Sequence, residues 1–451
     1  MNRYSNICRA VGLSTAILAT CATANAAAEG GLTPFGAELA GSKDGQIPTY
    51  TGGIKEFPDG FKPDSGKWVD PFKDEKPILQ ITEKNYQQYS DKLSEGAIEL
   101  FRRYPNYRMD IYPTHRSVSF PDWYLKNSEK NSETAKLEKN GLSVVGAFGG
   151  KPFPVPRTGL EALWDWEMRY EGASQSNRTK IWLVDSAGTS ILVSQIKADQ
   201  YFPYYDIERE SEFKKKGGEA FWYEIYNDYA APARMIGATS LFRMPMDMAD
   251  HDEQTWEYNP GQRRVRVAPD LAYDTPEPSY SGAITMDDVF LFFGKMDRWN
   301  AKLVGKKEMY IPYNDYRQTY EAPASKILTP HFVNPDHGRW ELHRVWVVEL
   351  TLKPGARHIY SKKTLYMDED GGGGMVDAYD QSGKLYRAGF ETTVPAYDYK
   401  IPYSLPYWFY DFQSGVYIFS NQASESPGVF FNVKFNNSYF TPEHMQASGI
   451  R

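Results

Sequence analysis

The stretch "TKIWLVDSAGTSILVSQIK", residues 179–197, decides the fold class. Two runs rich in β-branched and other apolar residues flank a short segment between Asp185 and Gly188, where turn-forming residues gather. Two such runs around a short turn are typical of an antiparallel β-hairpin. From this point toward the C-terminus we therefore expect β-structure built from neighbouring hairpins.

Other segments extend this pattern in both directions. Further paired runs with a period of two occur at 254–268, 339–352, 363–391 and 415–435. Helical spacing occurs at 82–101, 131–139 and 160–170. It also occurs inside the β-rich region at 285–293, where Thr285 and Asp288 have the spacing of a capping box. Many short antiparallel strands with a few helices predict an α+β fold that is mainly antiparallel β. We expect a large curved sheet or unclosed half-barrel, with helices covering its concave face.

The chain divides into three parts by composition. Residues 1–26 carry Arg3 and Arg9, then an apolar run, then small residues ending at Ala26, which is the pattern of a secretory signal peptide cleaved after about Ala26. Export to the periplasm follows, although "LATC" also allows a lipid anchor at Cys21. Residues 27–80 are rich in Gly and Pro and predict an extended N-terminal arm. Residues 81–451 contain no linker and predict a single β-rich, carrier-like domain.

Composition excludes several classes of function. Both cysteines, Cys8 and Cys21, lie in the predicted signal peptide, so the mature chain would form no disulfide and would have no thiolate metal site or cysteine nucleophile. A formal net charge of -7 makes nucleic acid an unsuitable partner. No apolar run after the signal peptide reaches the ~20 residues of a membrane span.

The segment "WEYNPGQRRVRVAP", residues 256–269, places three arginines close together in this acidic chain. Asn259 to Gln262 fits a tight turn, which would pair Tyr258 with Arg263 and Glu257 with Arg264. Alternation then places Arg264 and Arg266 beside Glu257 on one face. The arrangement is explained either by a cation–π contact and a solvated ion pair or by direct binding of an anion.

Three segments resemble a known family of exported proteins. They are "LTPFGAELAGSKDGQIPTYTGG", "WEYNPGQRRVRVAP" and "GRWELHRVWVVELTLKPGARHIYSKKTLYMDED", and the resemblance to domain-of-unknown-function family 1329 covers nearly the whole mature chain. The resemblance implies similarity to outer-membrane lipoprotein-sorting carriers, whose unclosed antiparallel barrel and helices enclose an apolar cavity. It also implies association with RND-type transporters and an outer-membrane partner, and it supplies no catalytic residues. The run "DEDGGGGM", from Asp368 to Met375, departs from the family pattern, in which a Trp and more apolar residues follow the acids.

The strand predicted at 340–352 is a possible cavity wall. One face carries six apolar side chains and the guanidinium of Arg344. Because a buried unpaired charge is costly, Arg344 must meet an acid, reach solvent or contact a ligand head group. Two aromatic clusters, at 201–206 and 401–412, suit either an apolar pocket or ordinary core packing.

Other motifs give no catalytic residue, metal site or cofactor. His331, His337 and His343 are six residues apart, which is not the spacing of metal ligands on a helix or in a zinc finger. The acidic run that starts at Asp368 lacks the distal Glu of a calcium loop. No G-x-S-x-G, H-E-x-x-H or Walker motif is present.

Together these features predict a periplasmic carrier or chaperone that binds a hydrophobic, lipid-like ligand in an open β-barrel and serves envelope export. Two alternatives are an accessory docking subunit of an RND-type exporter or outer-membrane partner, with no ligand of its own, and an envelope hydrolase. The candidate ligand-binding residues are Arg344, Trp340, Trp346, Trp256, Tyr258, Arg263, Arg264 and Arg266.

Overall fold

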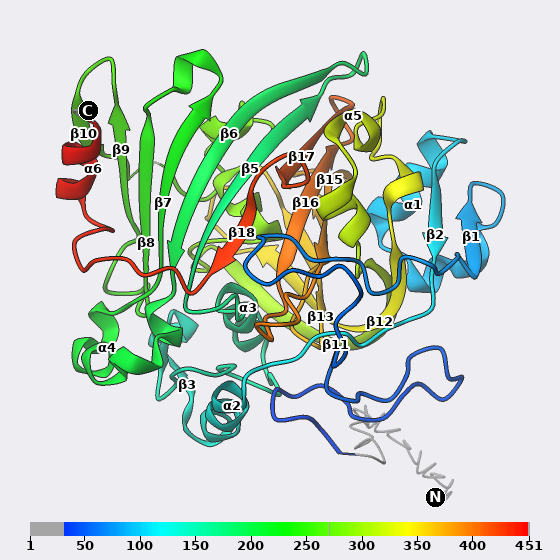
Figure 1. Cartoon of the computed structure of the whole chain (residues 1–451), viewed down its shortest axis with the longest axis horizontal. Coiled ribbons are helices and arrows are strands. Elements are labelled where there is room, and N and C mark those ends of the chain that lie inside the picture. The colour runs from blue at the N-terminus through cyan, green and yellow to red at the C-terminus, as the bar shows by residue number, and fades with distance from the viewer. Residues whose placement is uncertain (1–30, 270, 450–451) are drawn as a thin grey trace, which may run out of the picture.

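The computed structural model describes residues 31–269 and 271–449, and one large β-sheet dominates it (Figure 1). In chain order its strands are β1 (Leu79–Thr82), β2 (Arg108–Ile111), β5 (Ser174–Val184), β6 (Ser190–Tyr201), β7 (Phe221–Ala231), β8 (Thr239–Pro245), β9 (Gln254–Asn259), β10 (Arg264–Val267), β11 (Trp299–Pro312), β12 (Trp340–Leu352), β13 (Lys362–Asp368), β14 (Gly374–Tyr379), β15 (Leu385–Thr393), β16 (Ser404–Asp411), β17 (Val416–Gln422) and β18 (Gly428–Phe431). A separate two-stranded sheet pairs β3 (Lys136–Glu138) with β4 (Ser143–Val145).

The strand order confirms the predicted fold class. Neighbours follow the order β1-β2-β12-β13-β14-β15-β16-β17-β5-β6-β7-β8-β9-β10, with β11 beside β12 and β18 beside β5. The strand pairs are antiparallel apart from a short parallel contact between β2 and β12. Because β1 and β10 end this order, the sheet formed by the described residues is not closed.

The hairpin predicted from residues 179–197 is present. Its strands are β5 and β6, and the Asp185 carboxylate closes the turn by accepting hydrogen bonds from the backbone N–H groups of Ala187 and Thr189, each at 2.9 Å. An Asp side chain that bonds the backbone of its own turn fixes the turn's shape. The local sequence therefore determines this hairpin.

Short helices accompany the sheet. They are α1 (Glu95–Arg103), α2 (Asp122–Thr134), α3 (Gly159–Glu167), α4 (Glu210–Lys216), α5 (Ala324–Ile327) and α6 (Pro442–Gly449). The single helix predicted at 82–101 is instead a 3₁₀ turn at Tyr86–Lys92 followed by α1. It breaks because the Ser94 hydroxyl accepts from the Ala97 N–H at 3.2 Å and so starts a new helix. The helix predicted at 131–139 is also misplaced, because α2 ends at Thr134 and β3 follows.

Helical elements lie on both faces of the sheet. We call inner the face that packs against α3 and the segment 277–293, which contains the 3₁₀ turns η7 (Pro278–Tyr280) and η8 (Met286–Leu291). The helix α1 packs on the other side of β14 and β15, and α6 packs on the outer side of β8, β9 and β10, at the end of the sheet where Figure 1 shows the C-terminus.

The segment 31–77 lies along the domain as turns and extended chain (Figure 1). The Trp68 indole N–H donates to the Asp398 carboxylate at 2.6 Å, and the Arg116 guanidinium donates to the Glu38 carbonyl at 2.6 Å. At Gly36 a Cβ atom would lie 1.6 Å from the Pro154 carbonyl oxygen. The segment is therefore held by close backbone packing as well as by polar contacts.

The glycine run of "DEDGGGGM" forms the crowded turn between β13 and β14. A Cβ atom would lie 2.1 Å from the Thr393 hydroxyl oxygen at Gly372, 2.4 Å from the Glu391 carbonyl oxygen at Gly373 and 2.1 Å from the Tyr366 carbonyl oxygen at Gly374. Such distances leave no room for a side chain. The run allows this turn to pack directly on β15 and β13.

Replacing Gly373 by Ala is expected to lower the free energy of unfolding by about 1–3 kcal/mol, because the new methyl group would overpack the turn. Urea unfolding followed by tryptophan fluorescence would measure the loss. Gly338→Ala is the matched control, since the nearest atom to a Cβ there is 3.7 Å away. Equal stability of the two variants would contradict this account of the turn.

Candidate functional site

A mainly apolar cavity lies between the inner face of β5 to β8 and the segment 277–293. Its empty volume is about 790 Å³, counting the open mouth. The apolar and aromatic part of its wall consists of Ile196, Ala198, Tyr223, Ile225, Tyr229, Phe242, Met286, Val289, Phe290, Phe293, Tyr403 and Leu405. The polar part consists of Glu171, Asn177, Thr179, Gln200, Asn227, Glu277, Ser279, Tyr280, Ser404 and Asn421.

Strand alternation produces this wall. On β6 the lining residues are Ile196, Ala198 and Gln200, and on β7 they begin at Tyr223 and again take every second position. The register of β5 and β6 pairs Asn177 with Ala198, so the lining continues across neighbouring strands. A period of two thus places one side chain in two from each strand on the cavity.

The segment 277–293, which we call the cover, lies over the cavity in an unusual backbone conformation. Within η8, Val289 is extended, and Phe290 and Leu291 have φ values of 52° and 68°. Left-handed conformations are unfavourable for bulky residues and persist where surrounding contacts hold them. The Trp166 indole N–H donates to the Phe290 carbonyl at 3.1 Å and provides one such contact.

Two smaller cavities continue beyond the first. One, of about 330 Å³, shares Glu171, Tyr223 and Phe290 with the main cavity, and the next, of about 340 Å³, shares Trp166 with the second. Phe290 therefore stands between the main cavity and the second one. The three spaces form a row along the inner face of the sheet.

A buried ion-pair cluster ties this cover to the sheet, and we call it the cover anchor: Asp287, Asp288, His358, Tyr360, Lys363 and Arg387. The Lys363 ammonium lies 3.1 Å from a carboxylate oxygen of Asp287 and 3.1 Å from one of Asp288. The Arg387 guanidinium lies 3.3 Å from Asp288. Burial alone would raise the pKa of Asp288, but these two cations hold that pKa well below its usual value.

The capping box predicted at Thr285 and Asp288 is confirmed, and it connects the cover to the anchor. The Asp288 carboxylate accepts from the Thr285 N–H at 3.2 Å and from the Tyr360 hydroxyl at 2.6 Å. One carboxylate thus caps η8 and pairs with two strands of the sheet.

The polar groups of the cavity wall are carboxyls, hydroxyls and side-chain amides. Burial raises the pKa of Glu277 to about 7, opposed by hydrogen bonds from the Ser279 hydroxyl and the Tyr280 N–H. The Tyr280 hydroxyl bonds the hydroxyls of Tyr407 and Ser420, the latter at 2.8 Å. This group of donors and acceptors suits a neutral polar ligand group better than an anion.

A second acidic group lies at the boundary with the smaller cavities. The Arg169 guanidinium lies 3.2 Å from Glu171 and 3.0 Å from Glu391. Burial raises the pKa of both carboxyls, that of Glu391 to about 8, since one cation offsets only part of the cost of two buried carboxylates. One of these two carboxyls therefore holds a proton near neutral pH.

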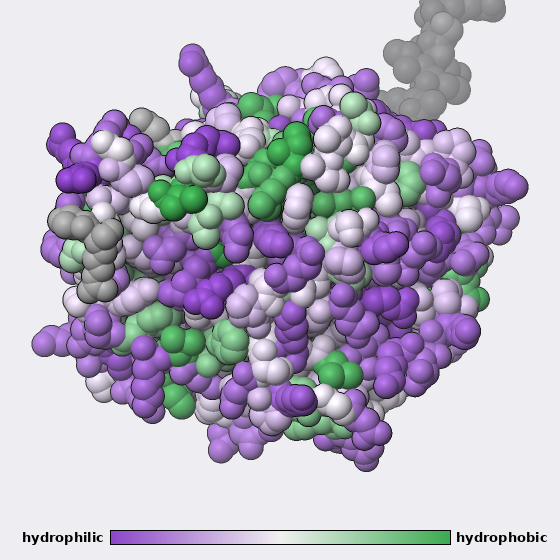
Figure 2. Space-filling view, turned by 45° about the horizontal axis from the view of Figure 1, so that its top comes forward, coloured by the Kyte–Doolittle hydropathy of each residue, from purple (hydrophilic) through white to green (hydrophobic). Residues whose placement is uncertain are grey.

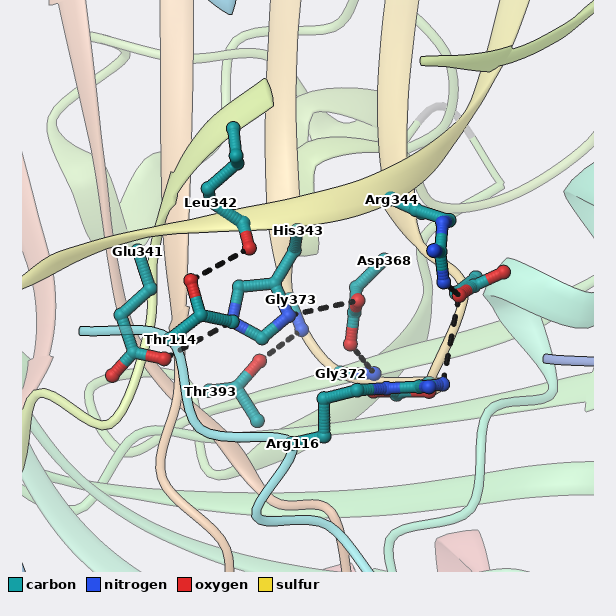
Figure 3. Close-up of polar contacts among 12 residues, drawn as sticks. Thr114, Arg116, Glu341, Leu342, His343, Arg344, Asp368, Gly372, Gly373 and Thr393 are labelled. Carbon is teal, nitrogen blue, oxygen red and sulfur yellow. Dashed lines mark hydrogen bonds and ion pairs between the residues drawn. The ribbon is translucent and has the colours of Figure 1, made fainter. Parts of the chain in front are cut away.

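Arg344 lies away from this cavity, among buried charges (Figure 3). It is 8% exposed, donates to the Ala40 carbonyl at 3.0 Å and lies 3.5 Å from carboxylate oxygens of Glu38 and Glu369. The segment 31–77 and the turn after β13 thus supply Arg344 with the intramolecular partners that its charge requires. These contacts connect β12 to the segment 31–77.

The two tryptophans of the same strand occupy different surroundings. Trp340 packs edge-on against Phe390, with ring centroids 5.6 Å apart. Trp346 lines the 340 Å³ cavity, and the Lys306 ammonium lies 4.7 Å from its ring centre. Neither lines the main cavity.

The arginine hairpin is present as β9 and β10, but its predicted register is wrong by two residues. Tyr258 pairs with Val265 and Glu257 with Arg266. The loop has four residues, because Arg263 adopts a left-handed conformation with φ of 49° and belongs to the turn. The predicted contact of Arg263 over Tyr258 is therefore wrong.

The faces of this hairpin follow the predicted alternation. Trp256 and Tyr258 lie on the outer face beneath α6, where the Tyr258 hydroxyl donates to the Gly449 carbonyl at 2.6 Å. Arg264 and Arg266 are exposed on the inner face of β10, the last strand of the sheet, and Arg263 is exposed in the loop. None of the three arginines lines the main cavity.

Sequence reasoning found only part of the cavity wall. The aromatic cluster at 401–412 supplies Tyr403 and Leu405, and the segment 285–293 supplies the cover. The period of two in 179–197 indicated which residues share a face, but it did not indicate which face would become the cavity. Glu277 had no sequence signal, since a lone acid before a Pro resembles a loop residue.

The face of the molecule seen in Figure 2 is largely hydrophilic, with separate small hydrophobic patches. No helix among residues 31–269 and 271–449 is long and apolar enough to cross a membrane. The predicted signal peptide and Cys21 lie outside the described residues.

Comparisons with known proteins give one family and several distant structures. The model of a family described as "Protein of unknown function (DUF1329)" matches residues 80–446. "Uncharacterized protein PA3922" of Pseudomonas aeruginosa is 34% identical over an alignment of 446 residues, which covers 97% of this chain and 96% of that protein.

Solved structures with similarity to this chain include a putative outer membrane lipoprotein-sorting protein domain from Vibrio parahaemolyticus, with a TM-score of 0.41 and 12% identity over 63% of this chain and 97% of that one. A DUF1329 family protein from Desulfovibrio piger has a TM-score of 0.40 and 13% identity over 61% and 92% of the two chains. A LolA superfamily protein, NE2245, from Nitrosomonas europaea has a TM-score of 0.35 and 12% identity over 62% and 94%.

Proposed function

The chain belongs to the DUF1329 family of proteins of unknown function, and we propose that it is a periplasmic carrier or chaperone that binds a hydrophobic, lipid-like molecule between the sheet and the cover. The observation that carries this proposal is the apolar cavity of about 790 Å³ beneath 277–293. Small-molecule sites are concave and mostly apolar, with a few polar groups at defined positions. Burial of ligand surface at ~25 cal/mol per Å² would supply the driving force.

The polar groups of the cavity restrict the ligand's polar end. Glu171 and Glu277 would repel an anionic head group when ionised, whereas hydroxyl or amide groups can bond them and Tyr280. The ligand class that fits is an apolar molecule with a neutral hydrogen-bonding end. Ligand contact by the eight residues predicted from the sequence stays a separate prediction. For Arg344, replacement by Leu should abolish ligand retention if its guanidinium contacts the ligand.

Location and partners are the remaining parts of this proposal. Periplasmic export rests on the sequence of residues 1–26, and delivery to an RND-type transporter or outer-membrane protein rests on the family resemblance. A docking subunit without a ligand and an envelope hydrolase are outcomes that the following experiment distinguishes.

Ala198→Trp is expected to reduce ligand retention at least tenfold, because the indole would fill the main cavity from β6. The protein would be expressed with its signal, purified from periplasm without detergent, and examined by native mass spectrometry followed by solvent extraction. The wild type should carry a discrete extra mass that extracts as an apolar compound. Arg178→Trp, on the exposed outer face of the adjacent β5, is the matched control and should keep that mass.

A clean mature mass for the wild type, repeated after incubation with envelope lipids, would contradict the carrier proposal and favour the docking subunit, which crosslinking would then test. Turnover of the added lipid would favour the hydrolase. Equal retention by Ala198→Trp and Arg178→Trp would place the ligand outside this cavity.

A further inference from the structure

One buried cluster of potential metal ligands lies at the turn between β13 and β14, and Figure 3 labels two of its members, His343 and Asp368. None of its residues lines the main cavity. The cluster consists of His343 on β12, Asp368 at the end of β13 and Asp370 in the turn. One ligand atom from each lies within 4.8 Å of the others, and all three residues are buried. Sequence spacing did not reveal this cluster, because two strands and a turn contribute to it.

The His343 ring is held in the orientation of a metal ligand. Its Nε2 atom lies 3.1 Å from a carboxylate oxygen of Glu341, and the ring stacks on Tyr313 with centroids 3.8 Å apart. These contacts leave Nδ1 facing Asp368, at 3.9 Å from Oδ1, which is too long for a hydrogen bond. In metal sites a ligating His almost always bonds a carboxylate or carbonyl through its other ring nitrogen.

Two residues that contact the His343 ring each have a buried oxygen with no hydrogen-bond partner within the described part of the chain. One is Oδ1 of Asp368, whose other oxygen accepts from the Gly372 N–H at 3.2 Å. The other is the hydroxyl of Tyr313, which is fully buried and stacked on His343. Buried polar atoms are rarely left unpaired, and those that are call for an explanation such as an ion.

The nearby lysine and arginine side chains pair with Glu369 and Asp370, and Asp368 is the acid of this turn that has no such partner. Arg116 bonds both oxygens of Asp370, at 2.9 and 2.5 Å. Lys306 and Arg344 pair with Glu369, at 2.6 and 3.5 Å. The ion-pair distances place no lysine or arginine of the described segments within 4.0 Å of the Asp368 carboxylate.

We propose that His343, Asp368 and Asp370 bind one divalent transition-metal ion of the Zn²⁺ class, with Glu341 orienting the imidazole. An imidazole nitrogen with carboxylate oxygens suits such ions, whereas Mg²⁺ and Ca²⁺ prefer oxygen ligands alone. Asp370 keeps free lone pairs for coordination while it accepts from Arg116. The ion would join β12 to the glycine turn, where the segment 31–77 also docks.

The test is zinc binding by the full-length mature protein after dialysis against EDTA. We expect one Zn²⁺ per chain by elemental analysis after gel filtration, and a higher melting temperature with ZnCl₂ than with EDTA. His343→Gln and Asp368→Asn should each weaken binding at least tenfold. His251→Gln is the matched control, because His251 lies in an acidic segment that could bind zinc adventitiously, and it should bind as the wild type does.

Co²⁺ substitution of the wild type provides a readout that requires no variant. Absorption bands of a four- or five-coordinate Co²⁺ with a nitrogen ligand should develop up to one equivalent and disappear on addition of Zn²⁺. Absence of zinc uptake by the wild type, or equal uptake by His343→Gln and the wild type, would overturn the proposal. The cluster would then be a purely structural network of polar contacts.

Discussion

Replacing Lys363 by Met is expected to lower the free energy of unfolding by about 3–5 kcal/mol, the usual cost of removing one partner from a buried ion pair. Lys363 is fully buried between Asp287 and Asp288. Without it, Asp288 keeps the Arg387 guanidinium as an ion-pair partner, and Asp287 keeps the His358 ring nitrogen as a polar contact. Chemical denaturation would measure this loss, and faster proteolysis within 277–293 would show that the cover itself has loosened.

Two further variants make this prediction specific. Lys362→Met changes the neighbouring residue, whose ammonium lies 4.0 Å from the Tyr379 ring centre, and should cost less than about 1 kcal/mol. The double variant Lys363→Met with Asp287→Asn should be more stable than Lys363→Met alone, because Lys363 is the only lysine or arginine of the described residues that pairs with Asp287, and the amide removes the carboxylate left without a cation. A small loss in Lys363→Met, equal to that of Lys362→Met, would contradict the anchoring role.

Most of the cover anchor could not be predicted from the sequence. Apart from Tyr360, its members are Asp287, Asp288, His358, Lys363 and Arg387, which no local period connects. Sequence did predict the capping box within it, since Thr285 and Asp288 interact over three residues. Long-range pairing of β17 with β5 brings the remaining elements together, and this pairing depends on topology rather than on a local pattern.

The two hairpins illustrate the same limit at short range. In 179–197 the turn residues fix the loop, so strand pairing follows from the sequence. In 256–269 the alternation gave the correct faces, but the left-handed Arg263 lengthened the loop and shifted the register. Family membership and the unclosed antiparallel sheet were both predicted, whereas the cavity wall needed the order of the strands.

The partners of Arg344 also depend on contacts that are distant in the sequence. Sequence correctly indicated that its charge needs a partner on an otherwise apolar face. The partners come from Glu38 in the segment 31–77 and Glu369 in the glycine turn, hundreds and tens of residues away along the chain. Glycine at positions 372–374 makes that turn possible, because a side chain at any of the three would overlap neighbouring atoms.

The protein is expected to lose stability as the pH rises from 5 to 9, because two fully buried carboxyls are neutral in the folded state. Burial raises the pKa of Asp315 to about 8 and that of Glu391 to about 8. A carboxyl whose folded pKa lies above its unfolded pKa stabilises the fold at low pH, and this contribution disappears as the pH passes through the folded value. Counting only one unit of each shift, at about 1.4 kcal/mol per unit, the two together lower the unfolding free energy by about 3 kcal/mol.

Denaturant unfolding at several pH values, with EDTA present throughout, would measure this slope. Glu391→Gln should remove about half of it, since a neutral amide can still accept from Arg169, as the Glu391 carboxyl does at 3.0 Å. Glu349→Gln makes the same chemical change at a partly exposed position of β12 and should keep the wild-type slope. A wild-type stability that stays flat or rises between pH 5 and 9 would mean that these carboxyls are ionised in the folded protein, and that Arg169 fully compensates both of its acids.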